Sequence, residues 1–224
     1  MWVLFDAVGT LIEPSPSAVE VYWKAGQKAG IDWQQQEVAR RFRAAFLRQE
    51  QQDQFENQLK TDESREHLRW QTIVAEVFSE IEDSNQVFEF LWDYFAQTHA
   101  WSIYPDACET INALDEQKVP WGIASNFDRR LRTIALEMPQ LSACQQLFIS
   151  SEMGLRKPHP DYFQAIQQTL KIPPREILFI GDDEQNDLSA RQLTEWQVLH
   201  LCRKKPDHTE GQITQLPEIL PYLT

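Results

Sequence analysis

The segment Trp2-Val3-Leu4-Phe5-Asp6-Ala7-Val8-Gly9-Thr10-Leu11 decides the fold of this 224-residue chain. Its first four residues are apolar without interruption, and Gly9 and Thr10 form a turn signal soon after. A short apolar run closed by a turn predicts a strand buried on both faces of a parallel sheet. Asp6 follows that strand directly, and open parallel sheets bind their ligands at the carboxyl ends of strands. Asp6 is therefore a candidate nucleophile or metal ligand; the alternative is an ordinary strand-end turn in which Asp6 accepts backbone hydrogen bonds.

Three later stretches carry polar groups at comparable points. The stretch Trp121-Gly122-Ile123-Ala124-Ser125-Asn126 predicts a second buried strand that ends in a hydroxyl and an amide. Gly154-Leu155-Arg156-Lys157-Pro158-His159-Pro160 places a lysine in a loop just before a helix. The third stretch, Ile177-Leu178-Phe179-Ile180-Gly181-Asp182-Asp183-Glu184-Gln185-Asn186-Asp187, predicts a strand followed by a cluster of acids. Helix capping is the alternative reading of those acids, but one cap needs only one of them.

In this order, the four stretches resemble the four motifs of the haloacid dehalogenase-like (HAD) hydrolase superfamily. The resemblance covers nearly the whole chain. It implies an α/β fold, with a Rossmann-like parallel sheet as core and an inserted four-helix cap. We expect the core to comprise residues 1–14 and 99–224, and the cap residues 15–98, where helical periodicity replaces strand signals. In this superfamily such an insert closes over the site and reads the substrate, and a lid of this kind excludes water.

The resemblance also implies the chemistry. Asp6, Ser125 and Lys157 are expected to be catalytic: Asp6 attacks phosphorus and forms an aspartyl-phosphate, while Lys157 neutralises charge and the Ser125 hydroxyl holds phosphate oxygens. Several ionised carboxylates in one crevice would repel, and a hard divalent cation such as Mg²⁺ resolves that repulsion. The expected Mg²⁺ ligands are Asp6, the backbone carbonyl of Val8, Asp182, and Asp187 directly or through a water; Asp183 is a less certain neighbour. Gly9, Thr10 and Asn126 are expected to bind the substrate.

Position 8 departs from the family pattern. Phosphatases of this superfamily usually carry a second aspartate two residues after the nucleophile, and this chain has Val8. Three outcomes stay open: a substrate whose leaving group needs no acid, a substitute acid such as Glu13, or a weak or inactive phosphatase that binds its ligand rather than turning it over. A 2-haloacid dehalogenase is a further alternative because a halide leaves without an acid. The cluster of acids around Asp182 counts against it, since dehalogenases usually lack one.

The composition of the chain limits which classes of binding partner and which cellular location are expected. A net charge of −13 argues against nucleic acid, which is itself a polyanion. No apolar run approaches 18 residues, so we expect no membrane span, and the N-terminus lacks the basic region of a signal peptide. Three scattered cysteines suit a reducing cytoplasm and no disulfide framework. The sequence thus predicts a cytoplasmic Mg²⁺-dependent hydrolase, a monomer or homodimer, acting on a small phosphorylated molecule.

Overall fold

Strand β1 (Trp2–Phe5) lies inside a six-stranded parallel sheet in the computed structural model, which describes residues 1–55, 59–203 and 210–223. The strand order is β5-β4-β1-β6-β7-β8, and Val3 pairs with Trp121 on one side and with Leu178 on the other. The remaining strands of this sheet are β4 (Trp121–Ser125), β5 (Gln146–Ile149), β6 (Ile177–Gly181), β7 (Gln197–Leu201) and β8 (Gln212–Ile213). The predicted Rossmann-like α/β core is confirmed.

Alternation along β1 gives the sheet two buried faces. Val3 and Phe5 belong to one apolar cluster with helices α5 and α6 and the 3-10 helix η3, whereas Leu4 belongs to another with α8 and α9. All three side chains are fully buried, as a strand covered on both faces requires. The core helices are α5 (Pro105–Glu116), α6 (Arg130–Glu137), α7 (Ser150–Met153), α8 (Pro160–Leu170), α9 (Ala190–Leu193), η2 (Pro174–Glu176) and η3 (Leu216–Leu223).

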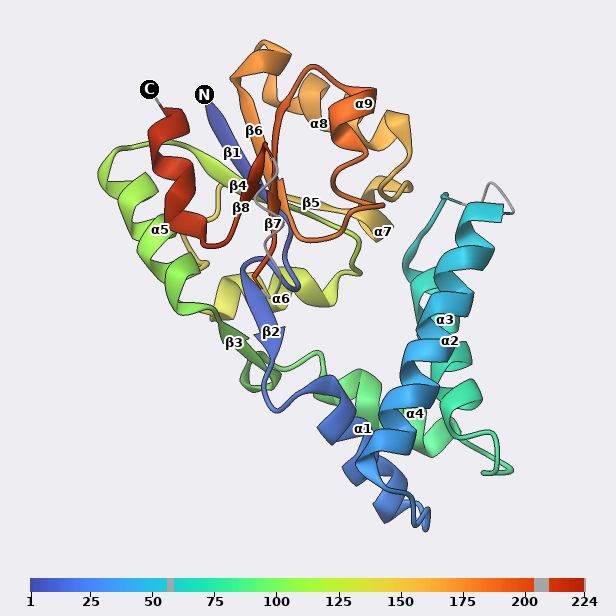
Figure 1. The fold of residues 1–224 in the computed structure, drawn as a ribbon. Coiled ribbons are helices and arrows are strands. Elements are labelled where there is room, and N and C mark those ends of the chain that lie inside the picture. The colour runs from blue at the N-terminus through green and yellow to red at the C-terminus, as the bar shows by residue number, and fades with distance from the viewer. Residues whose placement is uncertain (56–58, 204–209, 224) are drawn as a thin grey trace.

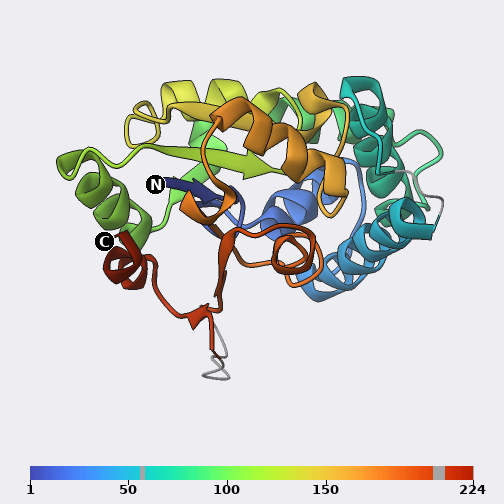
Figure 2. The same cartoon turned by 90° about the horizontal axis from the view of Figure 1, so that it is seen from above.

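Four helices between β2 and β3 form a lobe of their own at one end of the core (Figures 1 and 2). They are α1 (Ala18–Lys28), α2 (Gln35–Phe55), α3 (Glu63–Val77) and α4 (Asn85–Tyr94). Their inward faces make a separate apolar cluster around Tyr22, Ile73, Phe78 and Phe88. The sequence predicts Thr61 or Ser64 as the N-cap of α3, but Asp62 holds that position and accepts the hydrogen bond from the backbone N–H of Arg65. We call this unit, residues 18–94, the helical lobe.

A two-stranded antiparallel ribbon joins the lobe to the core. It consists of β2 (Ile12–Pro14) and β3 (Trp101–Ile103), with the short 3-10 helix η1 (Thr98–Ala100) before β3. Sequence patterns did not indicate these two strands, because three residues are too few for alternation to be recognised. The ribbon brings the two ends of the lobe together beside the carboxyl end of β1 (Figure 1).

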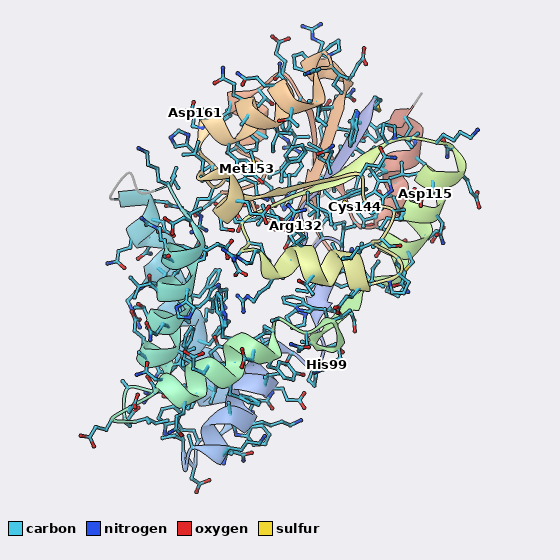
Figure 3. All side chains as sticks on the ribbon, turned by 180° about the vertical axis from the view of Figure 1, so that it is seen from behind. His99, Asp115, Arg132, Cys144, Met153 and Asp161 are labelled. Atoms are coloured by element: carbon cyan, nitrogen blue, oxygen red, sulfur yellow. The ribbon has the colours of Figure 1, made fainter. Side chains whose placement is uncertain are left out.

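The carboxyl ends of the strands face the lobe, whereas the N-terminus and η3 lie at the opposite end of the core (Figures 1 and 2). Arg132 of α6 and Met153 of α7, labelled in Figure 3, mark the two core helices nearest the lobe. Within the described ranges, no helix is both long and apolar enough to cross a membrane. The scattered positions of the three cysteines predict small buried apolar residues, whereas in the structure all three are free and only half-buried.

Candidate active site

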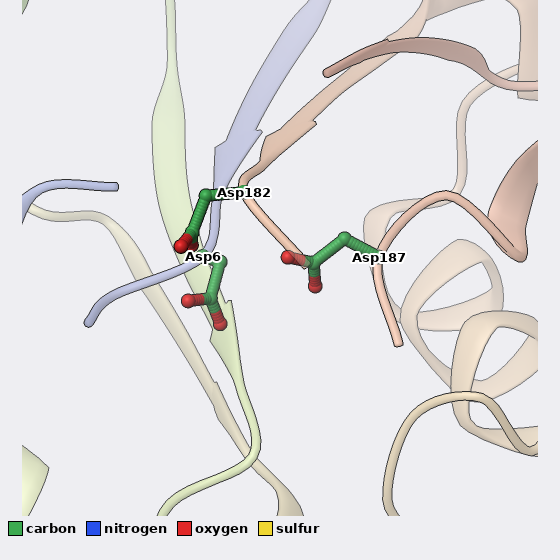
Figure 4. Close-up of side chains that lie close together, drawn as sticks. All are labelled: Asp6, Asp182 and Asp187. Atoms are coloured by element: carbon green, nitrogen blue, oxygen red, sulfur yellow. The ribbon is translucent and has the colours of Figure 1, made fainter. Parts of the chain in front are cut away.

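Three aspartates meet where β1 and β6 end (Figure 4). Asp6 follows β1 directly, and Asp182 and Asp187 follow β6, so the parallel pairing of β1 with β6 carries them to one edge of the sheet. One carboxylate oxygen from each lies within 4.8 Å of the others. The expected convergence of these residues is therefore present in the structure.

Lys157 lies among these carboxylates and is itself almost completely buried. Its Nζ donates hydrogen bonds to Asp6 Oδ1 at 2.7 Å, to Asp187 Oδ1 at 2.5 Å and to the carbonyl of Ala124 at 2.9 Å. All three donors of the ammonium group are thus used, which a buried lysine requires. Burial alone would lower the pKa of Lys157, but the charges of Asp187 and Asp6 outweigh it and raise that pKa.

The side chain of Asn126 holds the lysine loop in place. Its Oδ1 accepts the backbone N–H of Lys157 at 2.8 Å, and its Nδ2 donates to the carbonyl of Lys157 at 3.0 Å. A paired amide of this kind fixes both the position and the direction of the loop. The side-chain amide is thus engaged with Lys157, while a substrate contact by Asn126 stays a prediction.

Gly9 and Thr10 shape the position of Asp182. The Thr10 hydroxyl donates to Asp182 Oδ1 at 3.1 Å. Gly9 has a φ of +91°, and a Cβ added there would lie 2.3 Å from Asp182 Oδ2. Only glycine permits both the left-handed backbone and this close approach. Gly9 and Thr10 are not among the described residues that line the cavity of this site. Their predicted contact with the substrate therefore stays a prediction.

Burial and mutual repulsion change the acidity of two of the carboxyls. The side chain of Asp182 is exposed at the cavity. Partial loss of hydration among the surrounding protein atoms and the charge of Asp6 nevertheless raise its pKa to about 6. Asp187 is buried, and desolvation raises its pKa to about 7 although Lys157 acts in the opposite direction. Both shifts have the cause expected for like charges gathered in a site of restricted hydration.

The donor set fits a hard divalent cation. When ionised, the three carboxylates carry three negative charges, and Lys157 supplies one positive charge, bonded to two of them. Two negative charges remain, concentrated on oxygen atoms that are the ligands Mg²⁺ prefers. Asp6, Asp182 and Asp187 could therefore hold Mg²⁺.

Ser125 and Val8 line the same cavity as Asp6. Ser125 ends β4 and is buried, and its hydroxyl has no hydrogen-bond partner within the described part of the chain. Val8 is 36% exposed, which leaves its side chain open to the cavity. Glu13, considered as a substitute acid, lies on β2 beside Tyr104 and is not among the described lining residues.

The cavity has a volume of about 360 Å³ and lies between the core and the helical lobe. Its core side carries the acids, Lys157 and Ser125, and its lobe side carries mainly aromatic side chains from α2, α3 and α4. One enclosed space therefore joins the reactive groups to an apolar wall. A volume of this size is typical of small-molecule sites.

A buried ionic cluster lines part of that cavity, and sequence reasoning missed it. Arg156 bonds Glu50 at 2.7 Å and also pairs with Asp53, so a core loop is tied to α2. Arg69 pairs with Glu50 and lies near Glu66, at 3.7 Å. Among the described residues, its Nε is the one side-chain nitrogen or oxygen that is shielded from solvent and has no hydrogen-bond partner. The only signal was the position of Arg156 next to Lys157, because ion pairs between distant segments leave no local pattern.

Comparison with known proteins agrees with this geometry. A model of the haloacid dehalogenase-like hydrolase family matches residues 1–193. A zebrafish (Danio rerio) haloacid dehalogenase-like hydrolase domain-containing protein 3 is 24% identical over all of this chain and 97% of its own. The phosphoglycolate phosphatase of Escherichia coli is 27% identical over 39% of this chain and 35% of its own.

Two solved structures have the same fold at low identity. A HAD hydrolase from Bacillus subtilis, bound to magnesium, superposes with a TM-score of 0.77 at 16% identity, covering 99% of this chain and 97% of that one. The L-2-haloacid dehalogenase of Xanthobacter autotrophicus superposes with a TM-score of 0.75 at 16% identity, covering 100% and 99%. Phosphatases and dehalogenases both occur among the similar proteins.

Proposed function

Because the chain belongs to the haloacid dehalogenase-like hydrolase family, we propose that it is a Mg²⁺-dependent hydrolase that dephosphorylates a small molecule through an aspartyl-phosphate on Asp6. The observation that carries the proposal is the joint position of Asp6, Asp182 and Asp187 around one buried lysine. The helical lobe would act as the cap that closes over the site. A relative that is a phosphoglycolate phosphatase gives further support.

Asp6 is prepared to act as a nucleophile. Its Oδ1 is held by Lys157 at 2.7 Å, while its Oδ2 accepts no hydrogen bond from the described residues. Oδ2 attacks phosphorus, a new P–O bond forms, and the bond to the leaving oxygen breaks with its electron pair on that oxygen. Water then displaces Asp6 from phosphorus, which releases inorganic phosphate and restores the carboxylate.

The other residues act on charge and position. Lys157 orients Asp6 and balances its negative charge, since it is bonded to that carboxylate and is itself almost completely buried. The Ser125 hydroxyl would donate to a phosphate oxygen. Mg²⁺, held by Asp6, Asp182 and Asp187, would supply the positive charge that an anionic transition state needs. Val8 supplies no proton.

A phosphate-release screen with Asp6→Asn as control tests the proposal. The purified protein with Mg²⁺ is expected to release phosphate from at least one member of a panel of phosphate esters and acetyl phosphate. Asp6→Asn should abolish that release, whereas Asp161→Asn, the same chemical change at an exposed residue of α8, should leave it unchanged. The proposal would be contradicted if no compound released phosphate and Asp6→Asn behaved like the protein without the substitution.

A 2-haloacid dehalogenase is a second candidate, because a halide leaves without an acid and Val8 provides none. Its substrate carries a carboxylate that needs a cationic partner. The two arginines that line the cavity from outside the lysine loop, Arg69 and Arg130, are each already paired with carboxylates. Chloride release from 2-chloropropionate that persists in excess chelator would favour this candidate over the phosphatase.

A binding protein without turnover is the third possibility that Val8 raises. Beryllofluoride with Mg²⁺ mimics an aspartyl-phosphate and needs no general acid. A rise in the thermal midpoint with both compounds together, absent in Asp6→Asn, would support a site that can carry the intermediate. Absence of that rise, with no phosphate release, would favour simple binding.

A further inference from the structure

We propose that the substrate is an aryl phosphate, in which the aromatic group bonded to the phosphate carries no charged substituent. This inference rests on the proposed function and names the substrate class of the same site. Two independent observations lead to it: the composition of the cavity wall opposite Asp6, and the absence of a proton donor at position 8.

The wall of the cavity that faces Asp6 is aromatic. Six large rings line it and remain only partly covered by protein, namely Phe42, Phe46, Trp70, Trp92, Phe95 and Trp101. Four of them come from the helical lobe, Phe95 follows α4 directly, and Trp101 comes from the ribbon strand β3. Uncovered apolar surface of this extent, gathered in one concave site, favours an apolar ligand that displaces water from it.

The same wall has no cation to spare for a second anionic group. Among the described lining residues, Arg69 and Arg156 are paired with the carboxylates of α2, and Arg130 is paired with Asp128 at 2.7 Å while it lies over the ring of Trp92. Lys157 is paired with Asp6 and Asp187. A leaving group that carried a carboxylate or a second phosphate would therefore be buried without a counter-ion, which is costly.

Val8 sets a separate chemical requirement. An alkoxide is a strong base and leaves only when an acid protonates it, a contribution of about 10²–10⁴-fold in rate. A phenol has a pKa of about 10, so its anion leaves without prior protonation. An aromatic hydroxyl therefore satisfies both requirements: its ring fits the wall, and its oxygen needs no donor at position 8.

The step balances without any further reagent. Asp6 Oδ2 forms a bond to phosphorus as the bond from phosphorus to the aryl oxygen breaks, and the aryloxide departs with the electron pair and takes a proton from water. A second water cleaves the aspartyl-phosphate, and the proton that it releases neutralises the hydroxide left by the first water. The products are a phenol, inorganic phosphate and the restored carboxylate.

Comparing leaving groups tests the proposal directly. With Mg²⁺ present, kcat/KM for 1-naphthyl phosphate is expected to exceed that for glycerol 2-phosphate and for phosphoglycolate by a factor on the order of 10² or more. Acetyl phosphate serves as reference, because acetate also leaves unprotonated but is too small to cover the aromatic wall. Its turnover reports on the reactive centre alone.

Variants separate the wall from the reactive centre. Trp70→Ala should raise KM for 1-naphthyl phosphate by about threefold to tenfold, a larger change than in KM for acetyl phosphate, which is too small to cover the wall. Leu68→Ala, on the same helix but 60% exposed and outside the cavity lining, should change neither. Should Trp70→Ala fail to fold, calorimetric binding of 1-naphthol to the unaltered protein gives the second measurement, with glycerol as the non-binding comparison.

Three results would overturn the inference. Equal or faster turnover of glycerol 2-phosphate or phosphoglycolate would contradict it while leaving the phosphatase proposal intact. Turnover of acetyl phosphate without any turnover of aryl phosphates would do the same. If no compound is hydrolysed at all, the phosphatase proposal fails. The aromatic preference is then tested by binding alone, and it is rejected if 1-naphthol does not bind.

Discussion

Position 8 decides which leaving groups this site can handle. Val8 lines the cavity and is 36% exposed, so an aspartate there would meet solvent and the substrate without displacing core residues. Val8→Asp is expected to raise kcat for glycerol 2-phosphate by about 10²–10⁴-fold, since it restores general acid catalysis. The increase for aryl phosphates should be much smaller, because their leaving group needs no proton.

The measurement is steady-state phosphate release from both compounds by the same preparation. Val8→Asn is the matched control, since it has the shape of aspartate but cannot transfer a proton from a carboxyl. An equal increase in kcat for Val8→Asp and Val8→Asn would contradict the prediction, because it would show that a polar side chain at position 8 suffices without proton transfer.

Gly9 offers a second prediction for a single residue. Gly9→Ala would place a methyl group where Asp182 Oδ2 now lies, and the φ of +91° adds strain of about 1–3 kcal/mol. Displacement of Asp182 is expected to weaken Mg²⁺ binding by about tenfold or more, as loss of a ligand contact does. Calorimetric titration with Mg²⁺ measures the effect.

Gly154→Ala is the control for that experiment. Gly154 has a φ of +80°, so it imposes similar backbone strain, but nothing lies within 4 Å of an added Cβ. It should lose comparable stability and keep its Mg²⁺ affinity. If both variants bind Mg²⁺ as the unaltered protein does, Asp182 is not held by its contact with Gly9.

At the scale of elements, the sequence predicted the strands and helices that have a clear period. The apolar runs of β1, β4 and β6 and the four helices of the lobe lie where the patterns indicated. The sequence pattern predicts a helix over 186–193, whereas that segment is mostly turn and only Ala190–Leu193 is helical. Asp183 explains part of this difference, because its carboxylate accepts the backbone N–H groups of Gln185 and Asn186 and so stabilises a turn.

Glu50 of helix α2 pairs with Arg156 of the core at 2.7 Å, and this contact predicts a pH dependence of stability. Burial would raise the pKa of Glu50, but the charges of Arg156 and Arg69 outweigh it and hold that pKa below its usual value. A carboxyl with a lowered pKa in the folded state stabilises it above the unfolded pKa, about 4.3 for glutamate, and this stability is lost as the pH falls through the lower folded value. The thermal midpoint should therefore decrease as the pH is lowered below about 4.3.

Glu50→Gln is expected to remove this part of the pH dependence. At pH 7 it should destabilise the protein by up to about 3–5 kcal/mol, because Arg69 and Arg156 stay buried with fewer partners. Glu76→Gln, which breaks a largely exposed pair with Arg48, should cost at most about 1 kcal/mol. The measurement is the thermal midpoint of the three proteins at pH 7 and at pH 4. If the midpoint of Glu50→Gln decreased between these pH values as much as that of the unaltered protein, the assignment of the pH dependence to Glu50 would be contradicted.

At the scale of the whole molecule, the sequence could predict the reactive centre but not the wall opposite it. Asp6, Lys157, Asp182 and Asp187 lie at strand ends or in loops, and parallel pairing brings strand ends together whatever the details of packing. The aromatic wall depends on which face of each lobe helix turns to the core. That choice follows from the ribbon β2–β3 and from the contact of Arg156 with α2, and neither leaves a periodic signal.

The charge of the molecule leads to the last prediction. With a net charge of −13 and three carboxylates converging at one point, the unliganded site repels itself, and a divalent cation relieves that repulsion. Mg²⁺ binds the folded state only, so it should stabilise folding by about 2.7 kcal/mol when its concentration is a hundred times the dissociation constant. The thermal midpoint should rise with Mg²⁺, return to its starting value with chelator, and stay low with Na⁺ at equal ionic strength.

Asp182→Asn separates this specific effect from general screening. Asp182 has no ion pair with a basic residue in the described part of the chain, so its replacement removes one negative charge and breaks no salt bridge. The unliganded variant should be at least as stable as the unaltered protein, because repulsion with Asp6 is lost, yet it should gain much less from Mg²⁺. Asp161→Asn carries the same charge change on the surface and should respond to Mg²⁺ as the unaltered protein does. An equal response in all three would mean that the ion acts by screening and not by binding among these aspartates.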